Sequence, residues 1–118
     1  VGAAMNESVG ASKTEEVALF KYETVGGKRT LDVGEGFTVS IGAEHHESAV
    51  KERVISAKAV RISAEEEIVL QVGAASITLK KNGDIRISGK NVVLNATGKL
   101  SGKASGEVAL KGSKTAGN

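Results

Sequence analysis

Residues 1–48 read VGAAMNES VGASKTEE VALFKYET VGGKRTLD VGEGFTVS IGAEHHES, which are six consecutive rows of eight residues. Every row begins with Val or Ile, and Gly follows in all rows except the third, where Ala18 stands. Self-similarity at a fixed period is the sequence signature of stacked repeat architectures. This octad repeat therefore decides the expected fold.

An octad is too short for a helical repeat unit but suits one short strand followed by a corner, because a strand rises about 3.3 Å per residue. The β-branched residue at the start of each row fits the inner face of such a strand. The Gly that follows can adopt a positive φ and let the chain turn sharply. We expect a less strained corner at Ala18.

The second half of the chain keeps the period with small slips. Apolar residues recur there at i and i+2, as in Ile77 and Leu79, which is the alternation of a strand. Asn82-Gly83 is a turn signal between residues 76–81 and 84–88, and it favours an antiparallel β-meander as a rival fold. Residues 43–72 contain no Gly, so a short helix or an irregular stretch at residues 43–56 stays open.

The composition excludes several classes of protein. Aromatic residues make up 3% of the 118 residues, Pro, Cys and Trp are absent, and there are 15 Gly, so a core must come from aliphatic side chains. The net charge of +2, with both signs interspersed, argues against nucleic-acid binding. No apolar run is long enough for a membrane span. Because the only Met is Met5, we interpret the sequence as a fragment of a longer polypeptide.

One octad strand has a single narrow apolar face, whereas a single-chain solenoid normally needs about twenty residues per rung. Three chains that wind together would close a triangular prism and leave no lateral sheet edge. We therefore expect an all-β, intertwined trimeric (triple-stranded) β-helix or β-prism over residues 1–114, with a frayed tail at 115–118. The expected trimer core comprises Val9, Val17, Val25, Val33, Ile41, Ile62, Ile68, Leu70, Ile77, Leu79, Ile85, Ile87, Leu94 and Leu100.

Chemical sites are few. His45 shares the parity of Ile41, and three copies around an axis would make it a weak candidate metal or anion ligand, although no Cys or carboxylate spacing supports a metal. Glu and Lys or Arg occupy separate octad columns, which allows ion pairing between rungs and between chains and would oppose a slip in register. No arrangement typical of a catalytic or cofactor site is found, so we expect no enzyme activity and no cofactor.

The octads and the later run GAASITLKKNGDIRISGKNVVLNATGKLSGKASGEVALKGSK, residues 73–114, resemble the C-terminal needle of VgrG proteins, the valine-glycine repeat spikes of bacterial type VI secretion systems. These spikes are related to the puncturing spikes of contractile phage tails. The resemblance implies a trimeric β-helix that pierces a target cell envelope, made in the bacterial cytoplasm and then secreted. An alternative is a phage-type tail spike or fibre that binds surface polysaccharide.

The resemblance also implies partners. A PAAR-type tip protein or an effector would bind the C-terminal end, while the tube protein would attach through N-terminal domains that this sequence lacks. The last rung of a β-helix leaves backbone N–H and C=O groups unpaired, so it is a template for another strand. The expected platform comprises Val108, Leu110, Lys111, Gly112 and Ser113.

We predict that Val33→Asp abolishes assembly. The substitution would place one carboxylate per chain at the axis of the trimer, and burying an unpaired charge costs several kcal/mol. Thermal melting and light scattering of the variant would measure the loss. Melting like that of the wild type would show that Val33 faces outward.

Overall fold

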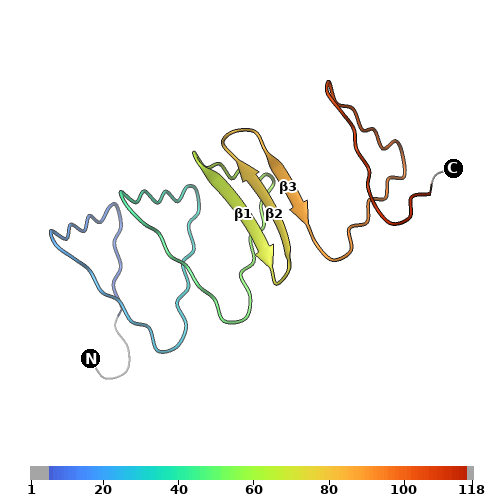
Figure 1. The fold of residues 1–118 in the computed structure, drawn as a ribbon. Coiled ribbons are helices and arrows are strands. Elements are labelled where there is room, and N and C mark those ends of the chain that lie inside the picture. The colour runs from blue at the N-terminus through green and yellow to red at the C-terminus, as the bar shows by residue number, and fades with distance from the viewer. Residues whose placement is uncertain (1–5, 117–118) are drawn as a thin grey trace. The chain divides into compact units, whose positions relative to one another are not determined.

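The computed structural model describes residues 6–116, and the regular secondary structure in that range consists of three strands without any helix. The strands are β1 (Glu67–Val72), β2 (Ala75–Lys80) and β3 (Ile85–Ser88). They form one antiparallel sheet in the order β1-β2-β3 (Figure 1). The β-rich class is thus confirmed, while the Val1-Gly2 pair and the last two residues of the expected tail lie outside the described residues.

The chain divides into two units, Val1–Val50 and Lys51–Asn118. In the described part of the first unit, the backbone bends sharply at residues 10–11, 18–19, 26–27, 34–35 and 42–43. Each bend begins directly after the Val or Ile that opens an octad, and Ala18 bends like the Gly residues do. Bends are therefore present at the positions that the repeat predicts. The expected positive φ is wrong for the described corners, because Gly10, Gly26, Gly34 and Gly42 all lack one.

The bends continue through the stretch without Gly. They occur at residues 50–51, at Lys58 and at residues 65–66, and after the sheet they return at residues 90–91, 97–98 and 105–106. Residues 43–56 contain neither helix nor strand. The bends in the stretch without Gly follow Ala49, Ala57 and Ala64 and are spaced by eight and then seven residues, so a bend does not require Gly.

Two tight turns connect the strands of the sheet. Gly73, with φ of 53°, and Ala74 form the two-residue turn from β1 to β2, and a positive φ at the first central residue is typical of a type II′ turn. Lys81, Asn82 and Gly83 form the second loop, in which Gly83 has φ of 98°.

The second loop is held by local hydrogen bonds. The N–H of Gly83 donates to the carbonyl of Lys80, and the N–H of Lys80 donates to the carbonyl of Asp84. Both bonds have a donor–acceptor distance of 3.0 Å. The side-chain oxygen of Asn82 accepts a 3.1 Å bond from the N–H of Asp84. This is a type I turn followed by a glycine bulge. The turn predicted from Asn82-Gly83 is confirmed, and residues 67–88 adopt the antiparallel meander of the rival fold.

No described residue has a buried side chain. The apolar residues of both units are in contact with solvent, including those expected in the trimer core, and the least exposed of them are Ile68, Ile77 and Leu79 in the sheet. Most of the described backbone outside the sheet has no strand partner. A single chain therefore provides no hydrophobic core.

We predict that Gly83→Ala lowers the melting temperature of the protein. A residue with a Cβ in left-handed backbone costs roughly 1–2 kcal/mol, and the Gly83 turn depends on φ of 98°. Gly98→Ala is the matched control, because Gly98 has no positive φ and no atom within 4 Å of an added Cβ. Equal melting of the two variants would contradict the prediction.

Candidate functional site

The uncovered apolar side chains are the main functional feature of the chain. The β-branched residues that open the octads, from Val9 to Ile41, are each 41–49% exposed. The side chains of Leu19, Phe20 and Tyr22 are 81–93% exposed. The predicted inner residues of the first unit are thus better sheltered than these three, whereas predicted inner residues of the second unit such as Ile62 and Leu94 are each 69% exposed.

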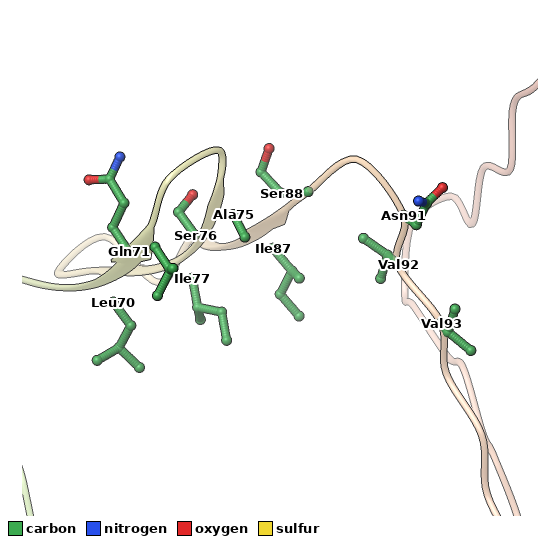
Figure 2. A pocket seen from close by; sticks show the side chains of 12 residues that line it. Leu70, Gln71, Ala75, Ser76, Ile77, Ile87, Ser88, Asn91, Val92 and Val93 are labelled. Atoms are coloured by element: carbon green, nitrogen blue, oxygen red, sulfur yellow. The ribbon is translucent and has the colours of Figure 1, made fainter. Parts of the chain in front are cut away.

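The sheet has one apolar and one polar face. Its register pairs Leu70 with Ile77 and Ile77 with Ile87 across the three strands, and it pairs Ile68 with Leu79 and Leu79 with Ile85. Figure 2 shows Leu70, Ile77 and Ile87 on one side of the sheet, with Gln71, Ser76 and Ser88 on the other. The structure therefore brings six of the predicted core residues onto a single face.

A hollow adjoins this apolar face. It has a volume of about 410 Å³ and is lined by the sheet and by the segment after β3, including Val92 and Val93 (Figure 2). Val92 and Val93 are not among the core residues expected from the sequence. The hollow is wide open and has no charged residue in its lining, so it suits apolar packing better than catalysis.

Three ion pairs repeat at the octad period. Lys13 Nζ lies 2.8 Å from Glu7 Oε1, Lys21 Nζ lies 2.7 Å from Glu15 Oε1, and Arg29 Nε lies 3.2 Å from Glu23 Oε1. Each pair joins residues i and i+6 of successive octads within one chain. The expected pairing between rungs is therefore present inside the chain, and its six-residue spacing could have been read from the sequence.

The two octads that follow these pairs carry different residues at the same spacing. Eight residues after Glu23 and Arg29, the positions of the acid and the base are occupied by Leu31 and Phe37. After eight more residues they are occupied by Val39 and His45. The octads are consequently not equivalent along the chain, because an apolar pair interrupts the charged column.

The histidines lie on the surface. His45 Nε2 is 3.6 Å from Glu47 Oε2, and His46 Nε2 is 2.9 Å from Glu44 Oε2. The side chain of His45 is 58% exposed and that of His46 is 85% exposed. Within residues 6–116, no three His, Cys, Asp or Glu side chains of one chain are grouped to hold a metal ion. Among these residues, His45 therefore belongs to no group that could hold a metal ion.

The predicted platform residues are all exposed. Val108 and Leu110 have exposed fractions of 65% and 83%, and the chain bends at Ser113. The platform residues form no strand, and none of them lines the hollow beside the sheet. The described residues also include no helix that is long and apolar enough to cross a membrane.

We predict that the pKa of Glu15 returns toward its ordinary value in a Lys21→Gln variant. The hydrogen bond and the positive charge of Lys21 lower the pKa of Glu15, and the hydrogen bond and charge of Glu15 raise the pKa of Lys21. The stabilisation by Glu15 is thus present above pH 4.5 and is lost as the pH falls through the lowered pKa. The contribution of Lys21 is present below pH 10.5 and is lost as the pH rises through the raised pKa.

NMR titration of the Glu15 carboxyl carbon measures this effect. Lys13→Gln is the control, since Lys13 is the weakest of the causes that act on the pKa of Glu15. A larger shift in the Lys13→Gln variant than in the Lys21→Gln variant would show that the 2.7 Å contact does not persist in solution.

Comparisons with family models and with curated proteins give no match. No protein-family model matches the sequence. No curated protein matches it either. The features that bear on function are therefore those of the chain itself, namely the octad repeat, the uncovered apolar side chains and the two-faced sheet.

Proposed function

We propose that this chain is the needle of a VgrG-type spike of a bacterial type VI secretion system, assembled as a homotrimer. The observation that carries the proposal is the octad repeat with its regular bends in a chain that buries no described side chain. The function is structural: a rigid trimeric β-helix that pierces a target cell envelope. The resemblance of the octads and of residues 73–114 to VgrG needles supports this assignment.

The energetics of a single chain support association. Ordering the backbone of one residue costs about 1–2 kcal/mol, and the compensating burial of a Val, Leu or Ile side chain provides about 1.5–3 kcal/mol. No described residue of the isolated chain obtains that burial. A folded state of this chain therefore requires a partner that covers its apolar residues.

The length of the repeat supports three copies. Eight residues span about 26 Å when extended, and the regular bends separate such segments along the chain. One segment then forms one side of a triangular prism, and three chains complete each level. Strands of different copies would pair along each side, which gives partners to the backbone that is unpaired within one chain.

A needle of this kind suits mechanical penetration. Its backbone hydrogen bonds would run along the whole assembly, and its thin core would consist of aliphatic residues. The tip end would be the platform of Val108, Leu110, Lys111, Gly112 and Ser113, which would receive a PAAR-type protein or an effector. The protein would be held in the bacterial cytoplasm before firing and would enter the target cell afterwards.

We predict a solution mass of about three times 12.1 kDa and loss of PAAR-type tip binding when residues 108–118 are deleted. Light scattering measures the mass, and a pull-down with a purified PAAR-type protein measures binding. Deletion of residues 115–118 alone is the control and should leave binding intact. A folded monomer would refute the trimer, and binding that survives the longer deletion in an intact trimer would refute the platform.

A further inference from the structure

The step from the start of β1 to the start of β2 has the length of an octad, but a reversal of the chain stands where the other octads have a corner. β1 begins at Glu67 and β2 begins at Ala75, so six strand residues and a two-residue turn make one octad. At Gly73, however, the chain reverses and β2 runs back along β1. The N–H of Lys81 donates to the carbonyl of Glu66 at a distance of 3.0 Å. In this region, neighbouring strands therefore belong to the same chain.

The two faces of this sheet differ sharply in chemistry. The apolar face carries no charge, and its residues are Ile68, Leu70, Val72, Ala75, Ile77, Leu79, Ile85 and Ile87. The opposite face carries the row Val69, Thr78 and Arg86, with Glu67 and Lys80 paired beside it. Only the apolar face needs cover, because a sheet must bury its hydrophobic side against another element.

Residues 6–116 leave this face exposed. Ile77 and Leu79, at its centre, are each 40% exposed, and Ile85 is 70% exposed. The segment after β3 contributes Val92 and Val93 to the edge of the adjoining hollow and leaves the hollow open (Figure 2). A cover for this face would therefore have to come from outside the described residues.

We propose that the apolar faces of three copies of this chain pack against one another, so that each copy supplies one whole side of a three-sided block at residues 67–88. This inference rests on the proposed trimer. A second and third copy fit the face because it is uncharged and therefore free of repulsion against itself. Its strands also match one octad in length, so the block has sides as long as those of the octad levels.

This block has a consequence for assembly. Octads that resemble one another can pair after a slip of eight residues with little change in contacts, since strand register is set by the pattern of apolar residues. The meander occurs once in the described chain, so a slip of eight residues would set its apolar face against octads of the other copies that lack such a sheet. Residues 67–88 thus determine the axial register of the three chains.

A disulfide can distinguish this block from intertwined strands. Val69 and Thr78 face each other on the polar side of the sheet. The bond from Lys81 to Glu66 and the alternation of the ladder place them in a non-hydrogen-bonded pair, where Cα atoms lie about 4.5 Å apart and a disulfide can form. The chain has no Cys of its own, so the double variant Val69→Cys/Thr78→Cys contains a single thiol pair.

The oxidised double variant should remain a trimer by light scattering and migrate as one chain on a non-reducing denaturing gel. Covalent dimers or trimers on that gel would overturn the proposal, because they would show that β1 pairs with β2 of another copy. A monomeric mass for the unmodified protein would instead refute the proposed trimeric function, so the two failures are distinguishable.

A second pair of variants tests which face is covered. Ile77→Asp should reduce the mass in solution threefold to that of one chain, whereas Thr78→Asp, its neighbour on the polar face, should leave the trimer intact. A trimer with normal melting in the Ile77→Asp variant would overturn the proposal. Loss of the trimer in both variants would also overturn it, because the polar face would then be covered as well.

Discussion

A rung of eight residues cannot enclose its own apolar side chains, and the remaining features of this chain depend on that constraint. The backbone bends at every octad, yet no described side chain becomes buried. The β-branched residues that open the octads are 41–49% exposed. Hydrophobic burial is the dominant favourable term in folding. The proposed homotrimer would provide the burial that the described residues lack within one chain.

The same constraint gives meaning to the three-stranded sheet. Residues 67–88 are the only described segment in which the chain satisfies strand hydrogen bonds by itself. Its two turns use positive φ at Gly73 and Gly83 to reverse the chain where octads would pass a corner. Even so, its apolar face stays uncovered. The sheet is locally complete in its hydrogen bonds and incomplete in its packing, which is why an interface between copies is the inference it supports.

Electrostatic interactions have a smaller part in this arrangement. The paired side chains from Glu7 to Arg29 are 48–66% exposed, and exposed ion pairs contribute about 0–1 kcal/mol each. Their value lies in regularity, because each pair joins successive octads of one chain. Leu31 and Phe37 occupy the positions of the acid and the base one octad later. The residues at these outer positions therefore vary, whereas Val or Ile opens every octad.

Much of the local structure could be predicted from the sequence. The octad period determined the bends, including the one at Ala18, and Asn82-Gly83 determined the second turn of the sheet, because both signals depend on the conformations that a few adjacent residues prefer. The candidate sites are less accessible to such reasoning. The platform at Val108–Ser113 and the weak ligand His45 depend on three copies meeting, so neither takes shape within one chain.

At the dipeptide Val72-Gly73, the tertiary structure and not the local sequence determines the backbone conformation. It has the same residues as the corner at Val25-Gly26, yet Gly26 has no positive φ whereas Gly73, with φ of 53°, reverses the chain. Local preference permits both conformations, since Gly adopts either sign of φ readily. The choice depends on residues outside the dipeptide, where Leu70 meets Ile77 and Ile68 meets Leu79 across the hairpin. The sequence by itself determined the period and the apolar column, and only cross-strand pairing decided where the chain turns back on itself.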